Sequence, residues 1–444
     1  MVIIAILFFL TILFVARPFR VTSLSEGIVG TYQSHDLPES VTHLLSRSLV
    51  LPEQSGKMKG DLVSGWDVNN DLTIYKFKLK DTYWSDGTKI KSDDIEFGIQ
   101  DVEVSYPDDQ TIQFKLKSTF SAFPSLLTKP VFKKGTLIGT GPYKVEKQEK
   151  SRIFLTKLVL KKVDAAVVTI PEIIIRFYPN EKTARLAYEL GEVQSLVGIN
   201  DVSLRENGIH NKLIQKTNFQ RIIVIFYNTK DPLLSNRSLR QALSYSAPEI
   251  KNEVLAKTPL NPLSWAYTGE VNDYLENHDA AKAALDRAKN SSSSESFKKE
   301  IILTSTPQLE NIGKQIISSW NSLGIKAVLR IESGIPQNFQ ALLISQSIPS
   351  DPDQYSLWHS TQTKTNLSQY SSARVDKDLE DGRKLSNEEE RKLKYIDFQK
   401  TLLEDSPAAF LYFPKYNILF LSKIEDDLNK VLAIQFPDLK LEPN

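Results

Sequence analysis

Cysteine is absent from the chain of 444 residues. Its absence excludes disulfides, thiolate metal sites, a cysteine nucleophile and a lipid attached through an N-terminal cysteine. A strong charge of either sign is absent as well, because 55 Lys and Arg residues against 54 Asp and Glu residues leave a formal net charge of +1. Nothing in this balance favours nucleic acid or another highly charged partner. We therefore expect a protein that is stabilised by packing and does not bind nucleic acid.

The sequence motifs of the common enzyme classes are also missing. The chain contains no GxGxxG, GxxxxGK[ST], GxSxG or HExxH segment, and these motifs carry dinucleotide binding, phosphate binding, acyl transfer and zinc chemistry. The histidines are few and lack the spacing of metal ligands. They are His35, His43, His210, His278 and His359. We predict that the protein is not an enzyme and has no catalytic residue, metal site or cofactor.

Turning to what is present, an uncharged apolar run, Val2–Ala16, opens the chain. It is shorter than the roughly 20 residues that comfortably span a bilayer, but such a run at an N-terminus is typical of a signal or an anchor. A buried strand or helix at the start of the fold is the alternative. Arg17 and Arg20 follow the run, and by the positive-inside rule alone they would favour a cytoplasmic body. We predict a signal or membrane anchor over residues 1–20, uncleaved or truncated.

Alternating apolar and polar residues predict strands in the first third of the chain. The stretches Leu72–Lys80 and Thr111–Lys117 both show this pattern, which is typical of half-buried strands. Between them, Asp81–Thr88 has the composition of a turn. The pair Asp93-Asp94 is suited to cap a short helix that begins near Ile95.

Strands followed by helices predict the architecture of the rest of the chain. The strand–helix units are Glu172–Tyr178 with a helix that stops at Gly191, Ile222–Tyr227 with a helix from about Asn236, and Glu300–Thr304 with a helix that stops at Gly324. A strand over Ile325–Ile331 completes a βαβ unit. A capping box of Ser386 and Glu389 predicts a last long helix that ends before Pro407. The fold class predicted is α/β or α+β with several domains.

Several aromatic residues lie in turn-rich segments. They are Tyr32, Trp84, Tyr143, Trp265, Tyr267, Tyr355 and Trp358. Aromatic side chains on loops are common in clefts that bind ligands by stacking. Ordinary core packing is the competing account for each of them, and the sequence pattern leaves both accounts open.

A set of segments resembles one known family, and the segments appear in the order that this family has. These segments include EGIVGTYQSHDLP (26–38), SGWDVNNDLTIYKFKLKDTYWSDGTKIKSDDIEF (64–97), GTGPY (139–143), VIFYNTKDPLLSNRSLRQALSYS (224–246), PLSWAY (262–267) and DPDQYSLWHSTQ (351–362). They are similar to segments of the extracellular solute-binding protein family 5, which comprises the oligopeptide-, dipeptide- and nickel-binding proteins of ABC importers. The resemblance covers nearly the whole chain.

The resemblance implies a periplasmic-binding-protein-like fold of two lobes with a ligand cleft between them. Lobe 1 would take residues 21–227 and a C-terminal return over 414–444, and lobe 2 would take 228–413. The short passage from Phe97 to Val102 implies that an extra subdomain of lobe 1 is reduced. The function implied is the substrate-binding component of an ABC importer, which closes about a hinge on a peptide. The implied partners are a peptide and a membrane permease, for a monomer on the extracytoplasmic face of the membrane.

The residues expected in the cleft follow from the resembling segments. They are Tyr32, Gly139, Tyr143, Trp265, Tyr267, Asp353, Tyr355, Trp358 and His359. One departure concerns Ile348, which stands where dipeptide-type relatives place an Asp that pairs with the amino group of the ligand. A buried ammonium without a carboxylate is costly, so peptide length stays open. The alternatives are a binding protein for a nickel chelate, a glycan or an opine, and a surface scaffold that has lost transport.

Overall fold

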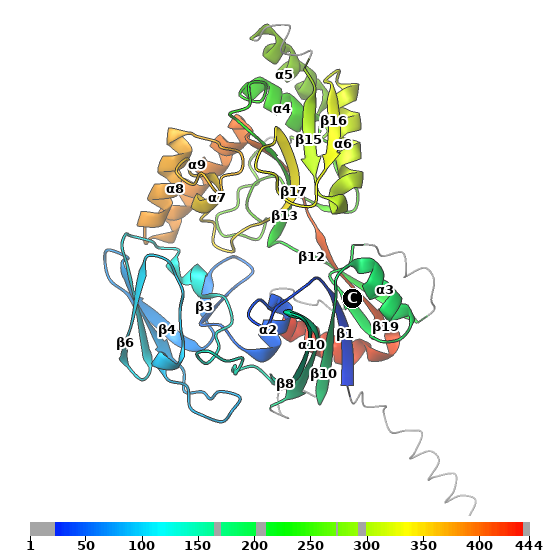
Figure 1. The fold of residues 1–444 in the computed structure, drawn as a ribbon. Coiled ribbons are helices and arrows are strands. Elements are labelled where there is room, and N and C mark those ends of the chain that lie inside the picture. Colours follow the sequence, from blue (N-terminus) through cyan, green and yellow to red (C-terminus); the bar gives the residue numbers. More distant parts are fainter. Residues whose placement is uncertain (1–22, 164–169, 201–209, 272–273, 292–298, 438–444) are drawn as a thin grey trace, which may run out of the picture.

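The structure is a computed structural model and describes residues 23–163, 170–200, 210–271, 274–291 and 299–437. Two lobes lie one above the other, and the chain passes between them (Figure 1). Lobe 1, the lower lobe in that view, holds a seven-stranded and a four-stranded sheet, and lobe 2 holds a six-stranded sheet. The predicted anchor, residues 1–20, lies outside the described residues, as do residues 438–444 at the end of the predicted C-terminal return.

The large sheet of lobe 1 combines parallel and antiparallel strands. In order across the sheet, its strands are β12 (Asn211–Thr217), β19 (Lys415–Leu421), β11 (Ser195–Val197), β1 (Ser23–Val29), β10 (Glu172–Tyr178), β9 (Phe154–Lys162) and β8 (Tyr143–Ser151). Only β1 runs parallel to its two neighbours, β10 and β11. Helices α2 (Glu39–Leu45) and α10 (Glu425–Gln435) cover one face with apolar side chains, and α3 (Glu181–Glu189) covers the other.

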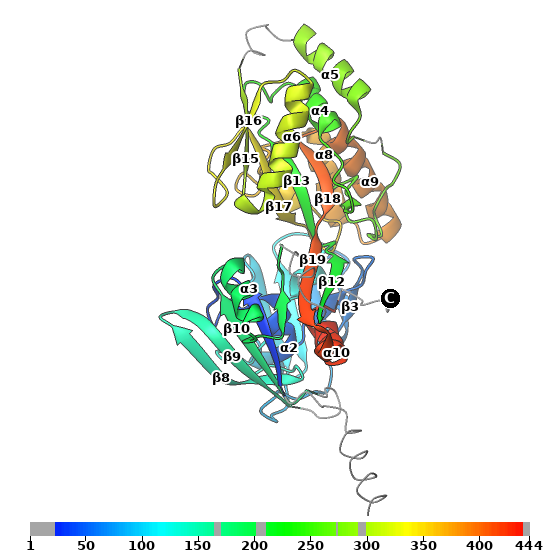
Figure 2. The same ribbon diagram turned by 90° about the vertical axis from the view of Figure 1, so that its right-hand side faces the viewer.

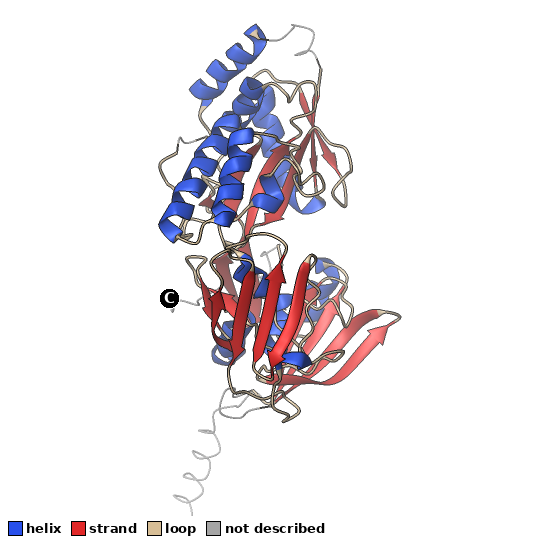
Figure 3. Ribbon diagram, turned by 90° about the vertical axis from the view of Figure 1, so that its left-hand side faces the viewer, coloured by secondary structure: helices blue, strands red, loops and turns tan. Residues whose placement is uncertain are grey.

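The four-stranded sheet of lobe 1 has a core of its own. Its strands, in order, are β4 (Val63–Val68), β5 (Ile74–Leu79), β7 (Thr111–Leu116) and β6 (Val102–Asp108), and the hairpin of β2 (Val50–Pro52) and β3 (Met58–Gly60) lies beside it. Every second side chain of β5 and of β7 is buried, which confirms the two half-buried strands predicted from alternation. Figure 3 shows this sheet on the side of lobe 1 that faces the helices of lobe 2.

The helix predicted from Ile95 is wrong. The structure has a single 3₁₀ turn, Ser92–Asp94, and residues 95–100 are neither helix nor strand. Two contacts explain this outcome. The carboxylate of Asp94 accepts hydrogen bonds from Trp84 Nε1 and from the backbone of Lys91, both at 2.9 Å, so it closes one turn and does not start a helix. Ile95 is 1% exposed and pairs with Lys133 in a β-bridge, which holds its backbone extended.

Lobe 2 is a three-layer α/β unit. Across its sheet the strands are β14 (Val254–Leu255), β18 (Ala408–Phe413), β13 (Arg221–Tyr227), β17 (Ala341–Ser347), β15 (Ile301–Ser305) and β16 (Ala327–Ile331). One face packs against α4 (Arg237–Ser246), α5 (His278–Asn290) and α6 (Glu310–Ser322). The other packs against α7 (Tyr355–Trp358), α8 (Ala373–Lys384) and α9 (Glu388–Asp405). The parallel pairing of β15 with β16 around α6 confirms the predicted βαβ unit.

The start of α9 differs slightly from the prediction. Asn387, not Ser386, is its N-cap, and the side chain of Asn387 accepts a hydrogen bond from Glu390 N at 3.1 Å. An Asn amide oxygen caps a helix as well as a Ser hydroxyl does, so the neighbouring residue takes the role. The helix ends at Asp405, before Pro407, as predicted.

The chain crosses between the lobes twice. It leaves β12 in lobe 1 and enters β13 in lobe 2 through residues 218–220, and it returns from β18 to β19 through Pro414. Figure 2 shows the return as one continuous path from the upper to the lower lobe. The predicted lobe boundary at 227 falls one strand too late, because β13 pairs with β17 and β18 of lobe 2. An apolar strand carries no signal for which of two sheets it joins.

Candidate ligand-binding site between the lobes

One cavity lies at the hinge side of the boundary between the lobes. Its volume is about 430 Å³. Pro38, Glu39 and His43 of lobe 1 line it together with Arg221 and Ser347 of lobe 2. The guanidinium of Arg221 donates to the Oγ of Ser345 at 2.9 Å and to its carbonyl at 3.0 Å. A guanidinium held by neutral acceptors keeps its full positive charge available to an anionic ligand group.

A buried carboxyl group lies behind the wall of this hinge-side cavity. Gln435 lines the cavity, and its Nε2 donates to Oε1 of Glu26 at 2.7 Å. Burial raises the pKa of Glu26 to about 7, although the hydrogen bond from Gln435 acts to lower it. Among the described residues, Oε2 of Glu26 and Oε1 of Gln435 have no hydrogen-bond partner. The site therefore has an acid behind its wall that titrates near neutral pH.

A second cavity, of about 590 Å³, lies between the four-stranded sheet of lobe 1 and helix α8 of lobe 2. The guanidinium of Arg383 lies 4.6 Å from the ring centre of Phe120 in lobe 1 and 3.9 Å from that of Tyr355 in lobe 2. Asp353 accepts from Arg383 Nε at 2.9 Å, which fixes the guanidinium between the two rings. This cation–π arrangement joins the two lobes through one side chain.

His359 extends the same stack within lobe 2. Its ring lies 4.0 Å from the ring of Tyr355, with the two planes 20° apart. Its Nε2 lies 3.2 Å from Oε1 of Glu380, and this hydrogen bond is the main reason why the pKa of Glu380 is lowered. Within lobe 2 the ring of Tyr355 thus lines the cavity and is in contact with both Arg383 and His359.

Direct contacts close the boundary around these two cavities. The backbone of Trp265 donates to the carbonyl of Ser55 at 2.9 Å, and Lys57 forms an ion pair with Glu388 at 2.8 Å. On the side of the four-stranded sheet, the backbone of Ser121 donates to the carbonyl of Arg383 at 2.8 Å. The lobes therefore touch in this structure, and the two cavities lie between them.

The structure brings some of the predicted site residues to the boundary. Tyr355 lines the second cavity, Asp353 and His359 hold it in place, and Trp265 forms part of the contact between the lobes. Tyr267 is half-buried against the core of lobe 2. Tyr32 is half-buried in lobe 1, where its ring lies 5.2 Å from that of Phe177. Ligand contact by any of these residues stays a prediction.

Three other predicted site residues have packing roles that account for them. Tyr143 is fully buried and donates its hydroxyl to the carbonyl of Ile170 at 3.1 Å. Trp358 is 1% exposed and donates Nε1 to Gln354 at 2.8 Å. Gly139 is buried against the turn at the end of α2. All three residues are buried in this structure, and ligand contact by them stays a prediction.

Gly139 supplies a test of its packing role. A Cβ at this position would lie 2.6 Å from the Cβ of Ser46 and would overlap the carbonyl oxygen of Leu45. We expect Gly139→Ala to lower the free energy of unfolding by about 1–3 kcal/mol through overpacking, measured by urea denaturation. Gly98→Ala is the matched control, because nothing lies within 4 Å of the added Cβ there. Equal stability of the two variants would contradict the packing role.

The sequence reasoning missed Arg221, Phe120 and Arg383. None of these residues belongs to a recognisable sequence motif. Their roles depend on contacts between segments that lie far apart in the chain. The alternation on β7 and the amphipathic character of α8 were visible, but neither pattern shows which residues of the two elements meet. Among the described residues, no group of three or more His, Asp and Glu could hold a metal ion. A search of the same residues found no helix of the length and apolarity that a membrane span requires.

Two α/β lobes joined by two strand crossings, with cavities at their boundary, define a two-lobed binding protein. The chain matches the family model of the bacterial extracellular solute-binding proteins, family 5 Middle, over residues 57–368, and it belongs to that family. The family groups solute-binding proteins and not enzymes. This confirms the resemblance and the fold class drawn from the ordered segments.

Individual relatives are distant. The chain is 21% identical over 419 residues to the probable D,D-dipeptide-binding periplasmic protein DdpA of Escherichia coli (strain K12), covering 82% of this chain and 81% of that protein. It is 25% identical over 241 residues to the oligopeptide-binding protein AppA of Bacillus subtilis (strain 168), covering 46% of this chain and 43% of that protein. The match thus spans less than half the length of the Bacillus relative.

Solved structures share the fold. The substrate-binding protein CtaP of Listeria monocytogenes superposes with a TM-score of 0.75 at 19% identity, over 91% of this chain and 94% of that one. NikZ of Campylobacter jejuni, in complex with Ni(L-His), gives 0.72 at 21% identity, over 89% and 94%. AppA of Bacillus subtilis, in complex with a nonapeptide, gives 0.70 at 19% identity, over 91% and 95%. At these identities the likeness establishes the two-lobed fold.

Proposed function

We propose that this protein is the substrate-binding component of an ABC importer and binds peptides between its two lobes. One observation carries the proposal: the space at the lobe boundary is walled by both lobes, and in the described part of the chain the backbone passes between them at two short crossings, residues 218–220 and Pro414. Small dihedral changes at two short crossings can open and close such a boundary around a ligand. The family and the peptide-binding relatives support peptides as the ligand class.

The chemistry of the hinge-side cavity fits one end of a peptide. Arg221 offers a guanidinium that can bind a terminal carboxylate through two hydrogen bonds. At the position of the amine-binding Asp of dipeptide-type relatives, Ile348 is 6% exposed and packs into the core of lobe 2. We therefore propose that the ligand is held by its carboxylate and backbone and not by an amino-terminal ion pair with residue 348.

The proposal also covers location and partners. We place the body of the protein on the extracytoplasmic face of the membrane, as the family's description as extracellular supports. The apolar run Val2–Ala16 would serve as its anchor, and a membrane permease would receive the ligand from the closed form. A monomer fits this task, because the two lobes of one chain already enclose the cavities.

Thermal unfolding with a peptide library tests the proposal. We expect tri- to nonapeptides with a free carboxylate to raise the melting temperature, since a ligand at 100 times its Kd adds about 2.7 kcal/mol. Arg221→Gln should lose this response more for free than for C-amidated peptides, whereas Lys150→Gln on an exposed strand should keep it.

Native mass spectrometry of freshly purified protein supplies the second measurement. A ladder of bound peptide masses supports the proposal. A single small mass would favour another solute, and the absence of both bound mass and thermal response to the library would reject peptide binding. Equal responses of the Arg221 variant to free and amidated peptides would remove Arg221 from the site.

A further inference from the structure

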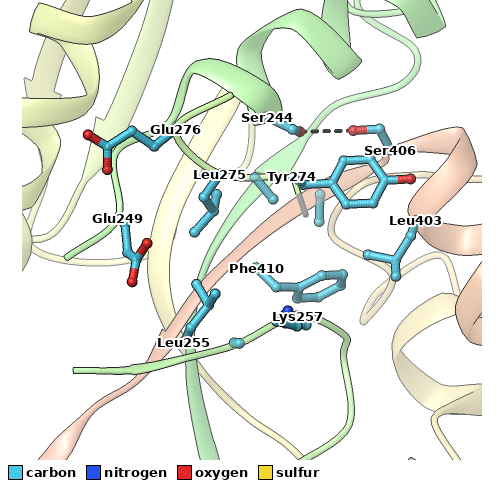
Figure 4. A pocket seen from close by; sticks show the side chains of 13 residues that line it. Ser244, Glu249, Leu255, Lys257, Tyr274, Leu275, Glu276, Leu403, Ser406 and Phe410 are labelled. Carbon is cyan, nitrogen blue, oxygen red and sulfur yellow. Dashed lines mark hydrogen bonds between the residues drawn. The ribbon is translucent and has the colours of Figure 1, made fainter. Parts of the chain in front are cut away.

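The outer edge of strand β18 in lobe 2 is only partly covered. β14 pairs with Tyr412 and Phe413, and the backbone of Ala256 donates to the carbonyl of Leu411 at 3.1 Å. Beyond this point the edge at residues 408–410 faces a cavity of about 460 Å³, whose walls are drawn in Figure 4. We call this cavity the β18 slot. It lies within lobe 2 and shares no lining residue with the two cavities between the lobes.

The backbone hydrogen bonds of β18 show which groups face the slot. In an antiparallel pair, successive residues point their N–H and C=O groups alternately to either side. Tyr227 N donates to Pro407 O at 2.9 Å, so residue 407 faces β13. Ala409 therefore also faces β13, opposite Ile225. Ala408 and Phe410 must then point their backbone groups to the other side, which is the slot.

These groups have no partner in the part of the chain that the structure describes. No backbone or side-chain atom there pairs with the N–H or C=O of Ala408 or Phe410 on the slot side. Both residues are buried, at 4% and 6% exposure. Buried backbone groups are nearly always hydrogen-bonded, and an uncovered strand edge is a template for another strand. The β18 slot therefore offers the donors and acceptors that an added strand would satisfy.

The slot has the room and the shape for a short extended chain. Three of the residues that line it are alanines, Ala256, Ala408 and Ala409. Their small side chains leave the space beside the strand open. Ser244 and Ser406 close one end with a hydrogen bond between their hydroxyls at 2.8 Å. A volume of about 460 Å³ falls in the range of sites for small ligands.

The charges around the slot favour a basic occupant. The carboxylates of Glu249 and Glu276 lie on the same side of it in Figure 4. Both residues are exposed, so they stand where an occupant meets solvent. Lys257 is the cation among the lining residues, and the two carboxylates outnumber it. An ammonium or guanidinium on the occupant would balance the excess negative charge.

We infer that the β18 slot binds an extended peptide segment of about three residues with a basic side chain, which adds to β18 in line with β14. This would be a second peptide-binding site, outside the boundary between the lobes, and it does not depend on the function proposed for that boundary. Backbone pairing would give affinity with little dependence on sequence, and the two carboxylates would select for charge.

Cysteine protection tests the inference, because the natural chain has no cysteine. Leu255→Cys places one thiol in the slot, and Glu39→Cys places one in the hinge-side cavity. Each variant is alkylated with iodoacetamide with and without acetyl-Ala-Lys-Ala-amide, whose blocked ends offer no terminal carboxylate to Arg221. We expect this peptide to slow alkylation of Leu255→Cys. Its backbone N-methylated analogue, which cannot pair with β18, should need about tenfold more peptide for the same protection.

Charge selection is tested in the same assay. In the background of Glu249→Gln with Glu276→Gln, the preference for acetyl-Ala-Lys-Ala-amide over acetyl-Ala-Glu-Ala-amide should disappear, whereas Glu189→Gln with Glu300→Gln, two exposed glutamates outside the slot, should keep it. Equal protection by the N-methylated analogue, or none, would overturn the inference. Protection of Glu39→Cys alone would overturn it and leave the proposed function intact. Concentration-dependent dimers that protect Leu255→Cys without peptide would assign the slot to a second copy and reject the inference.

Discussion

Replacing Arg391 with methionine should lower the free energy of unfolding of lobe 2 by about 3–5 kcal/mol, because it leaves a buried carboxylate without its cation. Arg391 donates to Asp351 at 2.9 Å, to the carbonyl of Gly382 at 3.0 Å and to the hydroxyl of Tyr395 at 3.2 Å. Its side chain is 10% exposed and that of Asp351 is 8% exposed. When one member of the pair is removed, water can therefore do little to solvate the charge that remains.

The loss should depend on pH. Burial raises the pKa of Asp351 even with Arg391 beside it, and the field of Arg391 acts to lower it. Without the guanidinium the carboxyl group can bind a proton more readily, so Arg391→Met should be less destabilised at pH 5 than at pH 8. Urea denaturation followed by tryptophan fluorescence at both pH values measures this difference.

Two further variants isolate the buried pair. Lys392→Met removes the neighbouring, less buried cation and should change stability by less than about 0.5 kcal/mol. The double variant Asp351→Asn with Arg391→Met should recover part of the loss, since it no longer buries an unpaired charge. The account fails if Arg391→Met costs no more than Lys392→Met, or if the double variant is less stable than Arg391→Met alone.

The second large effect concerns Glu26, the carboxyl group behind the hinge-side cavity. It is fully buried and its pKa is raised from 4.5 to about 7. A carboxyl group can have a higher pKa in the folded protein than in the unfolded one. Its contribution to stability is then complete at pH values below the unfolded-state pKa and is lost as the pH rises through the folded-state pKa. The difference of 7 − 4.5 corresponds to about 3 kcal/mol, lost between roughly pH 4.5 and 7.

Glu26→Gln should therefore flatten the dependence of stability on pH. Around the carboxyl group, Gln435 of α10 donates to it, and His43 of α2 contacts the carbonyl of Gln435. Burial and, after it, the charge of Glu26 raise the pKa of Tyr416 of β19. The glutamine amide keeps the shape and one hydrogen bond without a proton to lose. Urea denaturation from pH 5 to 8 should show wild type weakening and the variant holding steady by comparison.

A second buried carboxyl group, that of Asp378, also affects how stability depends on pH, so the measurement on Glu26 needs a control. The pKa of Asp378 is also raised to about 7, mainly by burial, and it contributes a slope of the same sign to wild type and variant alike. The difference between the two slopes therefore reports Glu26 alone. Glu189→Gln, at an exposed position on α3, should keep the wild-type slope. Parallel curves for Glu26→Gln and wild type would show that Glu26 does not titrate between folded and unfolded states in this range.

Much of the fold could be predicted because its signals are local. Alternation placed β5 and β7, and Gly324 marked the end of α6 before the parallel partner of β15. The helix at Ile95 failed because the acidic pair Asp93-Asp94 looks like a cap, whereas Asp94 uses its carboxylate to hold Trp84. Such a contact spans two loops, and no periodicity reports it.

The candidate site was only partly predictable for the same reason. The aromatic residues in turn-rich segments include both cavity-lining and core residues, and the sequence does not distinguish them. Tyr355 lines a cavity, whereas Trp358, three residues later, is enclosed in the core of lobe 2. Their difference arises from the direction of each side chain on the short helix α7. Arg383 and Phe120 meet only because the lobes touch, so their stack depends on the tertiary arrangement.

The position of β19 in the sheet of lobe 1 bears on the order in which the chain can fold as it is synthesised. β19 lies between β12 and β11, and among the described strands β12 pairs with β19 alone. All strands of lobe 2 precede it in the chain and can pair before it emerges from the ribosome. The sheet of lobe 1 stays incomplete between β12 and β11 until residues 415–421 have been made. Only then can the second crossing between the lobes form. Among the described residues, β19 is thus the last strand to be made, and it joins β12 to the rest of its sheet.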